Sequence, residues 1–195
     1  MSRKHPLRGL CRSLLHPVRG RALAFLFLLL SAASVTAQEA AIPSMEMEAL
    51  AAYIGTWHAE ERATPDGRSF HFVYELGWFD PTQTIIEMVI TQRFDDGEDQ
   101  LLWKGFKGWD PVSGRVYYHG FSPSGRAAAG HVEMDGSRLV TAYVGWSASG
   151  SPVEIRDVFS PVESGSFAAT TLLRPSPDDE WREISSDLWR RVEGA

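Results

Sequence analysis

The chain has 195 residues, with 25 acidic against 19 basic side chains and a single cysteine, Cys11. Six of the basic residues and none of the acidic ones precede residue 38, so the remaining 158 residues carry 13 basic and 25 acidic groups. This balance excludes a basic nucleic-acid-binding face, and one cysteine excludes an internal disulfide framework.

Residues 1–37 have the layout of a secretory signal peptide. Basic residues from Arg3 to Arg21 precede an apolar run at 22–30, and small residues lead to Ala37. The apolar run is well short of the ~20 residues that span a bilayer, so a stable membrane anchor is not expected. The sequence therefore predicts export to the periplasm or the medium, followed by a flexible leader over residues 38–44.

A short amphipathic helix is predicted next, from Met47 to Ile54. Ser44 stands at its expected N-cap, and Gly55 can end it. Because apolar residues repeat at helical spacing, we expect one face of this helix to close an end of the domain that follows.

Nine turn signals divide the rest of the chain into ten segments of strand length. Successive signals start 12 to 15 residues apart, which leaves no room for crossover helices and indicates sequential antiparallel hairpins. Glycine, proline, aspartate and serine supply the turn conformations. The signals lie at residues 65–67, 80–82, 95–97, 110–114, 122–125, 135–137, 147–151, 161–165 and 175–179.

The segments alternate with a period of two, as at residues 70–79, 139–146 and 181–190. Uniform short connections favour a closed barrel over a sandwich, because closure removes exposed strand edges. The prediction is an all-β, antiparallel up-and-down β-barrel of about ten strands with one short N-terminal helix, covering residues 45–192. A sandwich remains the alternative.

Three local patterns give this domain a family likeness. They are Gly55-Thr56-Trp57 after the helix, the strand–turn–strand unit at residues 108–118, and Trp189-Arg190 near the end. With these patterns the chain resembles the calycin-like barrels: lipocalins, fatty-acid-binding proteins, nitrobindins and uncharacterised secreted bacterial domains. The resemblance implies that Gly55 and Trp57 are structural and that Arg190 packs over Trp57. Nitrobindin-like barrels hold haem through a late histidine, and none follows His131 here, so no cofactor is expected.

A barrel of this size has interior room for a ligand. We expect a small apolar or planar molecule to bind inside, with an oligomeric state that the sequence leaves open. The residues expected to line its pocket are Phe72, Tyr74, Met88, Trp103, Tyr118 and Tyr143.

Two other functions stay open at this point. One is a barrel enzyme, an isomerase, cyclase or lyase acting on a lipophilic substrate, and the other is an envelope interaction module whose barrel is filled by side chains. Mid-strand Glu75 and Glu87 and the histidines His71 and His119 are the candidates for acid–base chemistry, although no catalytic residue is assigned. The spacing of the four strand histidines does not suggest a metal site, and none is expected.

Overall fold

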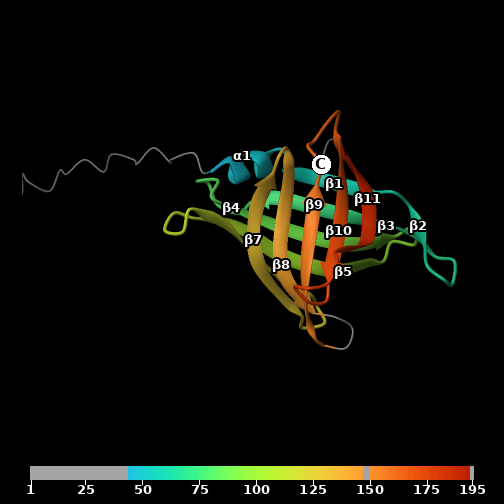
Figure 1. Cartoon of the computed structure of the whole chain (residues 1–195). Coiled ribbons are helices and arrows are strands. Elements are labelled where there is room, and N and C mark those ends of the chain that lie inside the picture. The colour runs from blue at the N-terminus through green and yellow to red at the C-terminus, as the bar shows by residue number, and fades with distance from the viewer. Residues whose placement is uncertain (1–43, 147–149, 194–195) are drawn as a thin grey trace, which may run out of the picture. The chain divides into compact units, whose positions relative to one another are not determined.

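A computed structural model describes residues 44–146 and 150–193 (Figure 1). The predicted signal peptide and residues 38–43 of the predicted leader lie outside the described residues. No helix in the described part of the chain is long and apolar enough to cross a membrane.

The described chain forms a closed antiparallel barrel of ten strands, in which each strand pairs with the next of the ten along the sequence. Hairpin turns replace crossovers, as the even turn spacing predicted. The ten barrel strands are β1 (Gly55–Ala59), β3 (Ser69–Trp78), β4 (Ile85–Phe94), β5 (Asp99–Asp110), β6 (Arg115–Phe121), β7 (Ala127–Asp135), β8 (Arg138–Trp146), β9 (Pro152–Phe159), β10 (Ser166–Arg174) and β11 (Arg182–Arg191).

Strand β1 closes the barrel because it pairs on both of its edges. Trp57 lies opposite Tyr74 of β3 on one side and Arg191 of β11 on the other. The two-residue strand β2 (Arg62–Ala63) adds to β3 beyond the end of β1. The all-β barrel with one short helix is therefore confirmed, and the sandwich alternative is wrong.

Helix α1 (Met45–Ala51) begins two residues earlier and ends three residues earlier than predicted. The chain leaves it through Ala52, Tyr53 and Ile54, whose N–H groups donate to carbonyls three residues back. Gly55 therefore starts β1 instead of ending the helix. Ser44 occupies the N-cap, but its hydroxyl makes no capping bond.

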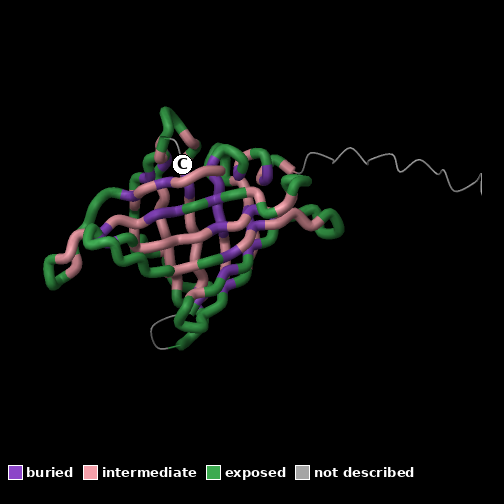
Figure 2. Tube along the Cα trace, turned by 180° about the vertical axis from the view of Figure 1, so that it is seen from behind, coloured by how far each residue is buried: buried purple, intermediate pink, exposed green. Residues whose placement is uncertain are grey.

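The helix covers one end of the barrel. Met47 and Leu50 are buried in the same core cluster as Leu139, at the start of β8, and Trp57 of β1. Figure 2 shows the buried residues mainly on the strands, while the hairpin turns are exposed. This end is thus the closed one, and the side chains of the opposite end decide what can enter.

Candidate functional site

The barrel interior contains a chamber of about 100 Å³. Inward-facing residues of eight strands line it, since alternate residues of a strand point to the same face. Tyr74, Met88 and Tyr118 supply apolar wall on one side, and Phe159 and Trp189 supply it on the other. We call this space the inner chamber.

A second space of about 350 Å³, the outer chamber, adjoins the first. Trp103, Tyr143 and Ala128 line it, together with Arg126 and Trp146 beside the β6–β7 and β8–β9 connections. These connections lie at the opposite end of β7 and β8 from the turn at residues 136–137, beside which Leu139 packs in one core cluster with α1. The chambers share the lining residues Met88, Ile90, Tyr118, Asp157 and Thr171, so they adjoin each other, and we refer to the two together as the cavity.

Five of the six residues predicted as pocket lining face this cavity. Tyr74 lines the inner chamber, Trp103 and Tyr143 line the outer one, and Met88 and Tyr118 line both. Phe72 lies outside the lining set of both chambers. Contact of these residues with a ligand stays a prediction.

Phe72 shares the inward face of β3 with Tyr74 but packs elsewhere. Its ring lies 5.3 Å from that of Phe70 and 5.2 Å from the guanidinium carbon of Arg62. The short strand β2 brings Arg62 into this position, and neighbouring side chains therefore occupy the space that Phe72 faces.

The aromatic wall of the cavity is fixed by contacts among its own members. The Trp103 indole N–H donates to the Tyr118 hydroxyl at 2.5 Å, and the rings of Tyr118 and Tyr143 meet edge to face at 5.1 Å. Burial raises the pKa of both tyrosine hydroxyls far above the usual range. These phenols therefore remain protonated near neutral pH and act as neutral polar groups.

Lys107 is the unexpected residue of the interior. It lies on the inward face of β5, is 2% exposed, and donates from Nζ to the Thr141 hydroxyl at 2.9 Å. Its ammonium also lies 5.0 Å from the centre of the Phe159 ring. Burial lowers its pKa to about 8, against a smaller opposing effect of the Asp157 charge.

Asp157 of β9 is the acidic side chain that lines both chambers. Its carboxylate accepts a hydrogen bond of 2.8 Å from the Thr171 hydroxyl, and Tyr143 is a further polar neighbour. Burial raises the pKa of Asp157, while Thr171, Lys107 and Tyr143 oppose the increase. The residue keeps partial solvent exposure because it lines both chambers.

The strand register explains why these polar groups meet. Thr141, Asp157 and Thr171 are direct neighbours across β8, β9 and β10 and therefore form one inward-facing row. Lys107 reaches this row from β5, which lies three strands from β8 in the sheet. A second acid, Asp187, lines the inner chamber but pairs with Arg62.

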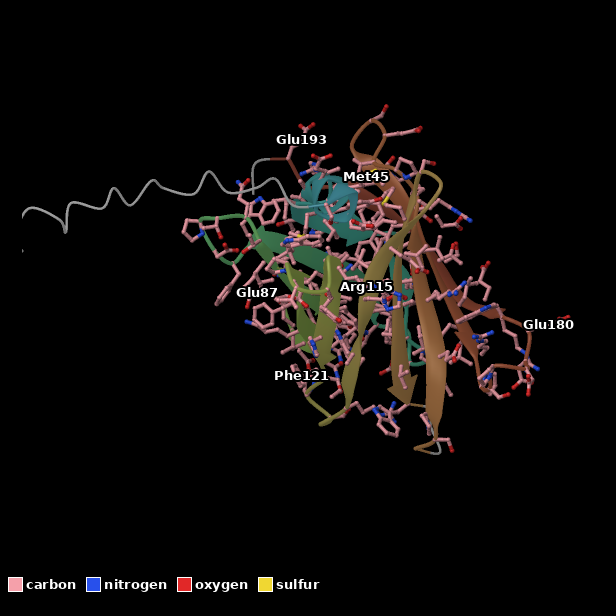
Figure 3. The ribbon with its side chains drawn as sticks, turned by 60° about the vertical axis from the view of Figure 1, so that its left-hand side comes forward. Met45, Glu87, Arg115, Phe121, Glu180 and Glu193 are labelled. Carbon is pink, nitrogen blue, oxygen red and sulfur yellow. The ribbon has the colours of Figure 1, made fainter. Side chains whose placement is uncertain are left out.

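Sequence reasoning missed both Lys107 and Asp157, and its acid–base candidates face outward. Glu87 pairs with Lys104 on the outside of the barrel (Figure 3), and Glu75 is exposed. The signal that could have found Lys107 is strand alternation, because residues 103, 105, 107 and 109 of one strand share a face. Placing Trp103 inside therefore also placed Lys107 inside.

The histidines also lie away from the cavity. His58 and His71 lie on neighbouring strands with their ring centres 4.5 Å apart and their planes tilted by 40°, and His119 is exposed. Burial, His71 and Arg93 lower the pKa of His58. No group of three potential metal ligands occurs among the described histidine, aspartate and glutamate side chains.

The role expected for Arg190 belongs to its neighbour. Arg191 places its guanidinium carbon 4.2 Å from the centre of the Trp57 ring, whereas Arg190 points outward to Glu60 at 3.3 Å. The prediction was wrong by one residue because Trp189 faces the interior, and alternation sends Arg190 the other way. Gly55 has φ +133° and lies against Arg191, in a conformation that favours glycine.

A separate hollow of about 410 Å³ lies over the outer face of β7, β8 and β9. Its main aromatic residue is Trp181. The guanidinium groups of Arg156 and Arg174 lie over the Trp181 ring, each 4.7 Å from the ring centre. Arg174 also pairs with Glu154. Side chains of the chain itself thus already cover this tryptophan.

No protein-family model and no curated protein matches the chain. Among solved structures, a de novo designed fluorescence-activating β-barrel is 17% identical and covers 74% of this chain and 97% of its own, with a TM-score of 0.33. Rv2717c from M. tuberculosis is 12% identical over 77% of this chain and 99% of its own, with a TM-score of 0.46. EF1p2_mFAP2b bound to DFHBI is 12% identical over 76% and 100%, with a TM-score of 0.34. At identities of 12–17% and TM-scores of 0.33–0.46, these structures assign no function to the chain.

Proposed function

We propose that this protein binds a small, largely apolar or planar molecule inside its barrel. One observation carries the proposal: two adjoining chambers with aromatic walls lie in a barrel whose other end is closed by α1. Burial of apolar surface is worth ~25 cal/mol per Å², so even a small ligand gains several kcal/mol before ordering costs. A barrel filled by its own side chains would leave no such space, and the interaction module is not favoured.

Binding can be tested on the purified protein with N-phenyl-1-naphthylamine, a neutral lipophilic fluorescent probe, and by native mass spectrometry. We expect saturable uptake at one site per barrel, or a retained small molecule. Ala128→Leu narrows the outer chamber and should weaken uptake about tenfold, whereas Ala129→Leu, on the outward face of the same strand, should leave it unchanged. The proposal would be contradicted if native mass spectrometry repeatedly finds no bound molecule and the protein also takes up no probe.

A barrel enzyme is the second candidate, because Asp157 and Lys107 place an acid and an amine against the aromatic wall. Raised and lowered pKa values of such neighbours suit proton transfer. The test is to identify a retained molecule before and after prolonged incubation. If the retained molecule is converted and Asp157→Asn abolishes the conversion, the protein is an enzyme. If the molecule stays unchanged, ligand binding is the only function supported.

We further propose that the barrel is of the calycin kind and acts outside the cytoplasm. The helix at one barrel end, Gly55-Thr56-Trp57 at the start of β1 and the arginine over Trp57 support the first part. The composition of residues 1–37 supports the second. Fusing residues 1–44 to alkaline phosphatase tests export, since this reporter is active only after translocation, and an inactive fusion would contradict it.

A further inference from the structure

The inner chamber presents unused hydrogen-bond donors. A lysine ammonium has three N–H groups, and only the bond to Thr141 is formed by Lys107 among the described residues. None of the described carboxylates forms an ion pair with it. The remaining N–H groups belong to a side chain that lines the chamber, so an acceptor on a bound molecule can reach them.

The same chamber presents unused acceptors. A carboxylate offers about four lone-pair sites, and Asp157 receives the Thr171 hydroxyl and has Tyr143 as a further neighbour. Because Asp157 lines both chambers, it lies at the boundary between the two spaces.

The register sets the distance between these donors and acceptors. Thr141 and Asp157 are direct partners across β8 and β9, and such pairs have Cβ atoms ~4.5–5.5 Å apart. Nζ of Lys107 is held on Thr141 at 2.9 Å, which brings it within reach of one bridging atom from Asp157. A single hydroxyl oxygen can accept from the lysine and donate to the carboxylate.

The charges of Lys107 and Asp157 determine which chemical group of a ligand can bind between them. A carboxylate ligand would attract Lys107 but repel Asp157, and an ammonium ligand would attract Asp157 but repel Lys107, so neither ion is favoured by both residues. A purely apolar end would remove water from both polar groups without replacing its hydrogen bonds, which is costly in a buried site. A neutral group that both donates and accepts satisfies the two residues together.

We propose that the ligand is a neutral hydroxylated aromatic compound, whose hydroxyl accepts from Lys107 and donates to Asp157 while its ring lies against Trp103, Tyr118 and Tyr143. This inference rests on the proposed binding function and specifies its ligand class. The aromatic wall supplies affinity, and the pair of polar residues supplies selectivity.

Four probes of related shape test the inference near neutral pH: 2-naphthol, 2-methoxynaphthalene, naphthalene and 2-naphthoate. In the unaltered protein, 2-naphthol should bind at least about tenfold more tightly than the other three, as expected for hydrogen bonds to charged groups. Asp157→Asn and Lys107→Met should each reduce this preference about tenfold. Lys104→Met and Glu87→Gln, which remove the ion pair on the outer face, should preserve it.

The outcomes separate this inference from the proposed function. Equal binding of 2-naphthol, 2-methoxynaphthalene and naphthalene would overturn the hydroxyl preference and leave ligand binding intact. Tighter binding of 2-naphthoate would overturn it in favour of an anionic ligand. Failure of every probe, including N-phenyl-1-naphthylamine, with a barrel that also retains no small molecule would overturn both proposals. The comparison in the unaltered protein decides the question even where a variant does not fold.

Discussion

Arg191 joins the last barrel strand to the end of the only helix in the described part of the chain through Trp57. Its guanidinium lies over the Trp57 ring and donates to the carbonyls of Ile54 at 2.5 Å and Ala52 at 2.8 Å. The indole N–H of Trp57 in turn donates to the Tyr53 carbonyl at 2.7 Å. Three carbonyls of the connection between α1 and β1 are thereby satisfied by two side chains of the barrel.

Replacing Arg191 by alanine should therefore destabilise the protein by about 1–3 kcal/mol, since it removes two charge-assisted hydrogen bonds and a cation–π contact. Arg190→Ala removes an exposed residue and should change stability by less than about 0.5 kcal/mol. Urea unfolding of the two variants provides the comparison. Equal effects would contradict the distinction between these neighbouring arginines.

Gly120 is a close-packing position beneath the aromatic wall. A Cβ added there would stand 2.5 Å from the Tyr118 hydroxyl and in collision with Nε1 of Trp103. Gly120→Ala should therefore cost about 1–3 kcal/mol, as overpacking does, and should shift tryptophan fluorescence. Gly77→Ala is the matched control, because nothing lies within 4 Å of its added Cβ. If Gly120→Ala is as stable as this control, Trp103 and Tyr118 can rearrange around the added methyl group without loss of stability.

The Trp103–Tyr118 hydrogen bond predicts a difference between two adjacent tyrosines. Tyr118→Phe removes the acceptor of the indole N–H and should lower the free energy of unfolding by about 1 kcal/mol. Tyr117→Phe alters a side chain on the outward face, 40% exposed, and should leave the free energy of unfolding nearly unchanged. Thermal unfolding of both variants measures the difference, and a larger loss for Tyr117→Phe would count against the assigned wall.

The fold was accessible from the sequence because its determinants are local. Each turn signal occupies a few adjacent residues, and alternation is visible within a single segment, so ten hairpin-linked strands follow without knowledge of distant contacts. The boundaries of α1 were less accessible. The helix begins and ends through backbone bonds around Ser44 and Tyr53, which the apolar spacing does not specify.

Lys107 and Asp157, the polar residues of the site, were not predicted from the sequence. Their charge indicates an exposed position, whereas strand alternation indicates an inward one. Charged residues are seldom fully buried without a partner, which favours placing Lys107 and Asp157 outside. Their positions on the same strand faces as Trp103 and Phe159 place them inside. The partners that make burial tolerable, Thr141 and Thr171, lie on other strands. Only the strand register brings Lys107 to Thr141 and Asp157 to Thr171.

Burial of Lys107 predicts a distinctive dependence of stability on pH. Its pKa is about 8 in the folded protein and 10.5 as the ordinary value. Between these values the unfolded chain binds more protons than the folded one, so stability should rise with pH. At 1.36 kcal/mol per pKa unit, the contribution of Lys107 over the whole window is about 3 kcal/mol.

Other groups facing the interior act in different pH ranges. Burial raises the pKa of Tyr53 to about 12, and those of Tyr74, Tyr118 and Tyr143 are also raised. Because the folded protein retains these protons longer, the tyrosines reduce stability as the pH rises above about 10. The raised pKa of Asp157 acts at the acidic end, where stability should fall as the pH rises above 3.8.

The contribution of Lys107 is therefore best measured by difference. Urea unfolding of the unaltered protein and of Lys107→Met, from pH 7 to 10, should give curves that separate in slope: the first gains stability relative to the second above pH 8. Lys104→Met removes a half-exposed amine that pairs with Glu87 and should retain the slope of the unaltered protein. Parallel curves for the unaltered protein and Lys107→Met would show that the buried amine does not change its charge in this range, and that its folded-state pKa lies near that of an exposed lysine.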